Sequence, residues 1–249
     1  MSFTETSTSN VGSSWDRVAV SYQNAARLPL NVATYGPGVG SEADFKLLGQ
    51  VQGKRVLDLG CGGGQNAIVF AREGAISIGV DISVQQLAFA KRLLEQEAVK
   101  VEFRHGDLAE LAFQRADTVD VVFSTFAFQY VPDINRVFRQ VHRVLKANGL
   151  FVFSVPHPVR YVVGDSSTRT TLEPQVNLDP QKVQRSYDDK SPIRSQAKDA
   201  FFVEHPHTVS DVVMGLLRSG FEVDTVLEPM GDDNNELPRA LVVRARKRA

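Results

Sequence analysis

Several features are scarce in this 249-residue sequence, and each scarcity argues against a class of protein. Cys61 is the single cysteine, so the chain can form neither an intramolecular disulfide nor a cysteine-rich metal site. The 28 Lys and Arg residues nearly balance the 29 Asp and Glu residues, which gives no electrostatic reason to expect nucleic acid or an acidic membrane as a partner. No run approaches the roughly 18–20 apolar residues of a membrane span, and the first residues lack an export signal. We expect a soluble protein of the cytoplasm.

The remaining sequence has the alternating pattern of an α/β domain. Short apolar, β-branched runs alternate with helical patterns, and a run such as 119–123 is too apolar for a half-exposed antiparallel strand. This pattern predicts a buried, mostly parallel sheet. Strands are expected at 54–59, 76–81, 99–104, 118–124, 149–155, 221–227 and 239–246. Helices are expected at 84–96, from Pro132 to a stop at Asn148 and Gly149, and at 209–219.

Two segments precede the main domain, and a third interrupts the α/β pattern within it. Residues 1–14 contain nine Ser, Thr or Asn residues and little to bury, which predicts a disordered tail. Residues 15–45 combine apolar side chains with a Gly-Pro-Gly turn and are expected to form a helical lid. Residues 46–249 are expected to form the main domain. Within it, 156–207 is predicted to be a functional insertion, because it holds six of the eleven prolines where a short loop normally suffices.

The strongest motif is a glycine-rich loop that follows a short apolar strand. Gly60, Gly62, Gly63 and Gly64 lie between that strand and a predicted helix, and glycines there let a ligand touch the backbone. About twenty residues later the next strand ends at Asp81, where a carboxylate can meet the ribose of a bound nucleoside. Two ligands fit this pattern: a dinucleotide, whose pyrophosphate is anionic, and S-adenosylmethionine, which carries a sulfonium and an ammonium.

Asp58, two residues before the first glycine, separates these two ligands by charge. A carboxylate beside a pyrophosphate raises the Coulomb energy, whereas one beside an ammonium lowers it. A third acidic strand end, Asp107, can accept a hydrogen bond from the exocyclic amine of adenine. Three carboxylates at successive strand ends therefore favour S-adenosylmethionine. Two alternatives stay open, since Asp107 could belong to an ordinary turn and Asp81 could cap the following helix. Ser83 and Gln86 begin that helix with the spacing of a capping box.

With these motifs in this order and spacing, the sequence resembles the class I S-adenosylmethionine-dependent methyltransferases over roughly residues 50 to 155, and more loosely to the C-terminus. RVLDLGCGGG, GVDIS, GDL and VLKANGLFVFSVP carry the resemblance. Within that family the sequence is most similar to small-molecule enzymes, such as the ubiquinone and menaquinone C-methyltransferases and natural-product O- and C-methyltransferases. The resemblance implies a three-layer Rossmann-like fold with a mostly parallel seven-stranded sheet whose last strand is antiparallel.

The resemblance also implies roles for individual residues. Asp81 would hold the ribose hydroxyls, Asp107 and Leu108 would flank adenine, and the first two glycines of the loop would line the methionine part. Ser124 would lie beside the cofactor, and Tyr22 of the lid would touch the methionine carboxylate. Together with Asp58 from the charge argument, the expected cofactor contacts are Tyr22, Asp58, Gly60, Gly62, Asp81, Ile82, Asp107, Leu108 and Ser124.

The region after the fourth strand narrows the acceptor class. DNA-base and protein-glutamine methyltransferases resemble one another in an Asn/Asp-Pro-Pro-aromatic motif there, and residues 124–130 lack it. Phe126 and Tyr130 in this segment, with Tyr161 and His205 of the insertion, are expected to bind a small apolar or aromatic acceptor. The aromatic side chains could alternatively belong to the core.

His157 is the expected catalytic residue. It follows the fifth strand between two prolines, at the sheet edge where open α/β sheets bind ligands. A neutral imidazole can accept a proton from a phenol or an activated carbon acid near pH 7. The alternative is a loop histidine that is hydrogen-bonded to the backbone. His205 and His207 flank a proline without a third ligand nearby, so no metal is expected.

The sequence thus predicts an enzyme that methylates a small molecule on oxygen or carbon, with no nucleic-acid or membrane partner. Two alternatives remain: a non-catalytic S-adenosylmethionine-binding protein, and a nicotinamide-dependent oxidoreductase on a similar layered fold. No sequence pattern indicates an oligomeric state.

Overall fold

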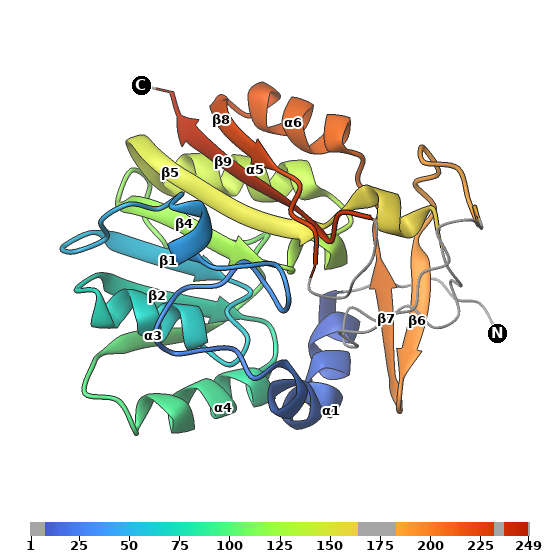
Figure 1. Cartoon of the computed structure of the whole chain (residues 1–249). Coiled ribbons are helices and arrows are strands. Elements are labelled where there is room, and N and C mark those ends of the chain that lie inside the picture. The colour runs from blue at the N-terminus through green and yellow to red at the C-terminus, as the bar shows by residue number, and fades with distance from the viewer. Residues whose placement is uncertain (1–7, 164–182, 232–236, 249) are drawn as a thin grey trace.

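The computed structural model describes residues 8–163, 183–231 and 237–248, and its centre is a seven-stranded sheet (Figure 1). The strands are β1 (Arg55–Leu59), β2 (Ile76–Asp81), β3 (Val101–His105), β4 (Val119–Thr125), β5 (Leu145–Pro156), β8 (Phe221–Leu227) and β9 (Ala240–Lys247). Their order is β3-β2-β1-β4-β5-β9-β8, and of these strands β9 runs antiparallel to its neighbours while the rest are parallel. The expected α/β fold with an antiparallel last strand is confirmed.

Helices cover both faces of this sheet (Figure 1). They are α3 (Gln65–Arg72), α4 (Val84–Leu94), α5 (Ile134–Val144) and α6 (Val209–Arg218). Side chains alternate between the two faces along each strand. Leu57 and Leu59 of β1 therefore join the core that contains α5 and α6, whereas Val56 joins the core that contains Phe70 of α3. The two cores, separated by the sheet, give the three predicted layers.

The N-terminal segment is more ordered than the sequence predicts. Helix α1 (Thr8–Ala26) begins at Thr8, so the prediction of a disordered tail over 1–14 is wrong for residues 8–14; residues 1–7 lie outside the described ranges. Ser14 is buried, and its hydroxyl donates to the carbonyl of Phe201 at 2.6 Å, while Trp15 packs on Phe202. Packing against a segment 187 residues away overrides the low helix propensity of a Ser- and Thr-rich stretch.

The lid predicted over 15–45 is helical only at its two ends. After α1 the chain is irregular until the single turn of α2 (Glu42–Phe45). Tyr35 in this stretch is fully buried, donates its hydroxyl to Glu42, and contacts the ring of Phe123 in β4. Apolar side chains between residues 33 and 51 consequently belong to the core on one face of the sheet.

The boundary between α5 and β5 also differs from the prediction. Asp133 begins the helix as expected, because its side chain accepts the Arg136 amide, but the helix ends at Val144 instead of reaching Asn148. Leu145 is fully buried and pairs with Val119 of β4, so strand pairing begins there. Burial of Leu145 thus stops the helix before the Asn-Gly signal.

The predicted insertion 156–207 contains two short elements within its described part. A 3₁₀ turn, η2 (Pro158–Tyr161), follows β5, and a hairpin is formed by β6 (Ile193–Ala197) and β7 (Ala200–Glu204). The hairpin lies beside α1 and packs on it (Figure 1). Residues 164–182 lie outside the described ranges. In the part of the chain that the structure describes, no helix combines the length and apolar character needed to cross a bilayer.

Candidate active site

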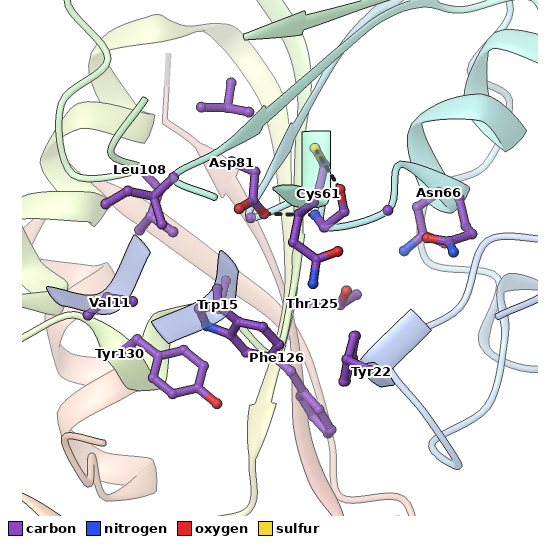
Figure 2. Close-up of a pocket in the computed structure, with 18 of the residues that line it drawn as sticks. Val11, Trp15, Tyr22, Cys61, Asn66, Asp81, Leu108, Thr125, Phe126 and Tyr130 are labelled. Atoms are coloured by element: carbon purple, nitrogen blue, oxygen red, sulfur yellow. Dashed lines mark hydrogen bonds between the residues drawn. The ribbon is translucent and has the colours of Figure 1, made fainter. Parts of the chain in front are cut away.

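A cavity of about 920 Å³, counting the space at its open mouth, lies at the carboxyl ends of β1, β2 and β4. The strand order reverses between β1 and β4, and open α/β sheets bind their ligands at such a point. Helix α1 supplies the opposite wall (Figure 2). Nine predicted site residues line the cavity together: Tyr22, Gly60, Gly62, Asp81, Ile82, Asp107, Leu108, Phe126 and Tyr130.

The glycine loop forms the floor of the cavity in a conformation that requires glycine. Gly60 has a φ of +68°, and a Cβ atom there would lie 2.4 Å from the Cβ of Ala127. Gly64 has a φ of +79° at the start of α3, where a Cβ atom would lie 2.6 Å from the ring of Phe103. Both positions therefore combine a left-handed backbone with space for hydrogen alone. The backbone of this loop is consequently open to a ligand.

Asp81 has a structural role as well as a place in the cavity wall. Its Oδ2 accepts the Gly62 amide at 2.8 Å, and its Oδ1 accepts the Ser83 amide at 2.8 Å. Asp81 therefore also helps to cap the start of α4, which was the alternative role predicted for it. Burial raises the pKa of Asp81 to about 6, although the two backbone hydrogen bonds favour the carboxylate. Each oxygen keeps a lone pair for a further donor.

The capping box predicted from Ser83 and Gln86 forms only in part. The Ser83 hydroxyl accepts the Gln86 amide at 3.0 Å, as a cap should. The Gln86 side chain instead bonds Gln23 of α1, and the Ser83 hydroxyl donates to Asp16 of the same helix. Both side chains are therefore bonded to helix α1, a contact that the sequence analysis did not predict.

Asp58 lies beneath the loop and does not line the cavity, which corrects the expected direct contact. Its side chain is 1 % exposed, and its Oδ2 has no hydrogen-bond partner among the residues that the structure describes. Burial and the charge of Asp81 raise the pKa of Asp58 to about 8, against the effect of a hydrogen bond from the Ala67 backbone. A buried, unsatisfied carboxyl group is stabilised by a nearby cation and destabilised by pyrophosphate. The observed environment therefore fits a cationic nucleoside.

Ser124 also lies outside the cavity. Its hydroxyl is fully buried and donates to the carbonyl of Leu59 at 2.7 Å, which joins β4 to β1. Thr125, the next residue, lines the cavity instead. The expectation failed because side chains of a strand alternate, so an error of one residue moves the predicted contact to the other face.

The structure contradicts the general-base role expected for His157. The imidazole is buried outside the cavity lining, its Nδ1 accepts the Val159 amide at 3.2 Å, and its Nε2 donates to Glu228 at 2.7 Å. Burial lowers the pKa of His157 although Glu228 acts in the opposite direction. A neutral imidazole with both nitrogens bonded has no lone pair left for an acceptor proton. His157 instead caps η2, as the loop alternative predicted.

Tyr161 and His205, two predicted acceptor contacts, are likewise absent from the cavity lining in the described part of the chain. The Tyr161 hydroxyl donates to the buried carboxylate of Glu204 at 2.9 Å. The His205 amide donates to the carbonyl of Gln129 at 2.7 Å. These contacts attach the hairpin to η2 and to η1 (Phe128–Tyr130) behind the cavity.

Helix α1 contributes Val11 and Trp15, which were not among the predicted site residues, beside Tyr22, which was. Val11, Trp15 and Tyr22 line the cavity from one face of the helix, and Val18 of the same stripe is buried. Their spacing of three or four residues is the signal that could have found them. The Trp15 ring makes edge contacts with Tyr22 at 5.1 Å and Tyr130 at 5.6 Å between ring centroids.

The cavity has two chemically different sides (Figure 2). Asp81 and Cys61 lie beside the glycine loop, and the rings of Trp15, Phe126 and Tyr130 gather opposite them. A glycine-rich loop and an acidic strand end at the switch point of a parallel sheet define a nucleoside-binding α/β protein. The apolar side provides room for a second molecule.

Comparisons with known proteins agree with this class. A model described as a methyltransferase domain matches residues 57–153. The crystal structure of an S-adenosylmethionine-dependent methyltransferase from Mesorhizobium loti is 30 % identical with a TM-score of 0.64, and the match covers 82 % of this chain and 95 % of that chain. Ubiquinone biosynthesis O-methyltransferases from Bordetella avium and Pseudomonas syringae are 38 % and 37 % identical. Those two matches cover 44 % and 41 % of this chain, and 45 % and 44 % of the relatives, which is less than half of each.

The chain therefore belongs to the class I S-adenosylmethionine-dependent methyltransferases. It is an enzyme, and S-adenosylmethionine is its cofactor. Between the two nucleoside ligands that the sequence left open, family membership and the environment of Asp58 both select the cationic one.

Proposed function

We propose that the enzyme transfers the methyl group of S-adenosylmethionine to an oxygen or carbon atom of a small apolar or aromatic acceptor. The observation that carries this proposal is the aromatic side of the cavity, where Trp15, Phe126 and Tyr130 lie across from the glycine loop and Asp81. Flat aromatic rings bury large apolar area and stack on other rings. The curated O-methyltransferases of ubiquinone biosynthesis support the same acceptor class, although they match over part of their length only.

The cofactor side of the cavity suits each part of S-adenosylmethionine. The free lone pairs of Asp81 can accept both ribose hydroxyls, and Ile82, Asp107 and Leu108 form a partly apolar slot for adenine. The amide groups at the start of α3 and in the glycine loop can bind the methionine carboxylate. The carboxylate of Asp58 stabilises the positive charge from beneath the loop.

The protein contributes orientation and exclusion of water more than acid–base chemistry. The bound cofactor supplies an electrophilic methyl group on a sulfonium. The titratable residues of the described cavity lining are Tyr22, Cys61, Asp81, Asp107 and Tyr130, with no histidine among them. Burial raises the pKa of Tyr22 to about 12, so its hydroxyl stays protonated at neutral pH and can donate a hydrogen bond. Alignment of two bound molecules can lower a barrier by roughly 7–11 kcal/mol without a base.

The direct test is turnover with a panel of acceptors. The purified enzyme is incubated with methyl-labelled S-adenosylmethionine and with phenols, catechols and apolar carbon acids, and labelled products are identified by mass spectrometry. We expect transfer to at least one aromatic acceptor, and an increased KM for that acceptor in Tyr130→Ala. Transfer restricted to a peptide or an oligonucleotide control would contradict the proposal.

A further inference from the structure

Three buried glutamines from three helices form a chain of hydrogen bonds in the cavity wall. Gln65 of α3 donates its Nε2 to the Oε1 of Gln23 in α1 at 2.6 Å, and Gln23 donates its Nε2 to the Oε1 of Gln86 in α4 at 2.8 Å. All three residues are buried and all three line the cavity. The Oε1 of Gln65 and the Nε2 of Gln86 have no protein partner among the described residues. One acceptor and one donor are therefore available to a ligand.

Gln23 lies directly against the glycine loop. A Cβ atom at Gly63 would be 2.6 Å from the Cδ and the Oε1 of Gln23, so a larger residue at position 63 would displace this amide. The loop and the start of α3 are where the amino-acid end of the cofactor is expected. That end is zwitterionic and needs an acceptor for its ammonium and donors for its carboxylate. The amide chain offers both.

The same helix also reaches the acceptor side of the cavity. Asp16 of α1 accepts the Gln85 amide at the start of α4 at 2.9 Å. The next residue of α1 is attached to the β6–β7 hairpin, because Arg17 donates to the carbonyl of Asp199 at 2.7 Å. Trp15, next to Asp16 in the chain, packs on Tyr130 and Phe202. Movement of α1 relative to the loop therefore moves Trp15.

We propose that Gln23 is a positioning residue: it holds Gln65 and Gln86, whose free amide groups bind the amino-acid end of the cofactor, and it thereby fixes α1, and with it Trp15, against the acceptor side of the cavity. The cofactor joins the amide chain through Gln65 and Gln86, so its binding links the three helices. This inference rests on the proposed function only in treating the aromatic side as the acceptor site. It predicts that the acceptor meets a complete pocket after the cofactor has bound.

The chain contains a single tryptophan, Trp15, so its fluorescence reports on α1 alone. The probes are S-adenosylhomocysteine, which keeps the amino-acid end, and 5′-methylthioadenosine, which lacks it. In the native enzyme S-adenosylhomocysteine should reduce acrylamide quenching of Trp15, and 5′-methylthioadenosine should reduce it less. The Gln23→Met variant keeps the side-chain length but removes two hydrogen bonds. It should bind S-adenosylhomocysteine about tenfold more weakly, with 5′-methylthioadenosine affinity unchanged.

Asn24→Ala is the matched control, since Asn24 is the exposed neighbour on the same helix and should behave as the native enzyme. Should Gln23→Met fail to fold, Gln23→Glu is used, which can still accept from Gln65 but cannot donate to Gln86. An equal loss of affinity for both probes would mean a purely structural role and overturn the proposal. Native affinity and native quenching in Gln23→Met would also overturn it. Failure of the acceptor panel, by contrast, would leave these measurements intact and concern the proposed function alone.

Discussion

The carboxyl group of Asp58 couples cofactor binding to a proton. With a pKa of about 8, the neutral form predominates at pH 7 while the cavity holds no cation. A sulfonium or an ammonium in the neighbouring cavity favours the carboxylate and lowers this pKa. Binding then releases a proton from Asp58, and a reaction that releases a proton becomes more favourable as the pH rises.

The affinity for S-adenosylmethionine should therefore increase between pH 6 and pH 8, by at most about tenfold per pH unit. Calorimetry in phosphate and in Tris, whose ionisation enthalpies differ, measures the released proton directly. Asp58→Asn should show a flatter pH dependence and less proton release. Titration of the ligand itself is common to both proteins and cancels in the comparison. Equal proton release in the two proteins would remove Asp58 from this role.

Asp81 should be the residue on which nucleoside affinity depends most. Two ribose hydroxyls donating to one carboxylate form charge-assisted hydrogen bonds, and their loss in Asp81→Ala should cost about 1.5–3 kcal/mol, or roughly 10- to 150-fold in Kd. Asp81→Asn should be milder because one amide oxygen still accepts. Calorimetry with S-adenosylhomocysteine measures both variants.

A control separates binding from helix capping, since Asp81 also accepts the Ser83 amide. Asp133→Ala removes a comparable cap at the start of α5, at a cost of about 1 kcal/mol in stability. Its affinity for S-adenosylhomocysteine should stay native. Unchanged affinity in a folded Asp81→Ala variant would show that the ribose lies elsewhere.

A substitution at His157 tests whether this histidine is a general base, as its position after the fifth strand suggested, or a structural residue. Because both imidazole nitrogens are bonded within the protein, His157→Ala should lower the melting temperature and leave the shape of the kcat profile between pH 6 and pH 9 unchanged. Thermal melting and turnover with an acceptor from the panel measure the two effects. A rate loss that recovers at high pH would restore His157 as a base.

The sequence located the acidic strand ends but not the contacts of every polar residue beside them. Asp81 and Asp107 could be predicted because each lies at or just after the end of a strand, at the ligand-binding edge of a parallel sheet. Ser124 and His157 could not, because their roles depend on the parity of a strand and on a distant partner, Glu228. No local pattern contains either piece of information.

At the scale of elements, the turn from β1 to α3 depends on the absence of a side chain at Gly60. Gly60→Ala would force a methyl group into the space of Ala127 and add a left-handed alanine, so the loop must rearrange. We expect lower stability and loss of detectable S-adenosylhomocysteine binding, measured by melting and calorimetry.

Gly53→Ala is the matched control for this substitution. Gly53 also has a positive φ, of +72°, but no atom of the described chain lies within 4 Å of its Cβ position. This variant should lose roughly 1–2 kcal/mol of stability from backbone strain and keep native affinity. Similar affinities in the two variants would mean that the close approach of Gly60 to Ala127 does not shape the site.

Element boundaries were predictable where local signals act alone. Strand 221–227 and the start of α4 match the sequence pattern because apolar alternation and a Ser83 cap define them. The early start of α1 and the start of β5 were not predicted, since burial against Phe202 and Val119 decides them. Such contacts join segments that are far apart in the chain.

For the whole molecule, the cavity joins the sheet, α1 and the loops into one unit that a ligand stabilises. S-adenosylhomocysteine at about 100 times its Kd should raise the free energy of unfolding by about 2.7 kcal/mol. For a chain of this length that corresponds to a rise of roughly 5–11 °C in melting temperature. The Asp81→Ala variant should lose most of the rise, as differential scanning calorimetry would measure. A native enzyme that melts at the same temperature with and without the ligand would contradict the assigned site.

The central sheet was easier to predict than the packing of helix α1 against the rest of the molecule. Five of the seven strands pair in parallel. Their apolar pattern and the order of helices and strands along the chain are therefore enough to predict the sheet and its switch point. The attachment of α1 to the hairpin depends on contacts such as that between Arg17 and Asp199, 182 residues apart. The periodicity of apolar residues reports only on neighbouring positions, so it cannot predict a contact over such a separation.

The position of the hairpin has a consequence for how such enzymes diversify. Phe202 of β7 does not line the cavity, yet it supports Trp15 and Tyr130, which do. Residues 200–204 also lie beyond the segment 57–153 that matches the methyltransferase family. Mutations accumulating in the hairpin during evolution can therefore tilt the two rings and change which molecules are accepted. A lineage could acquire a new acceptor through residues that never touch it, while the glycine loop stays under unchanged selection.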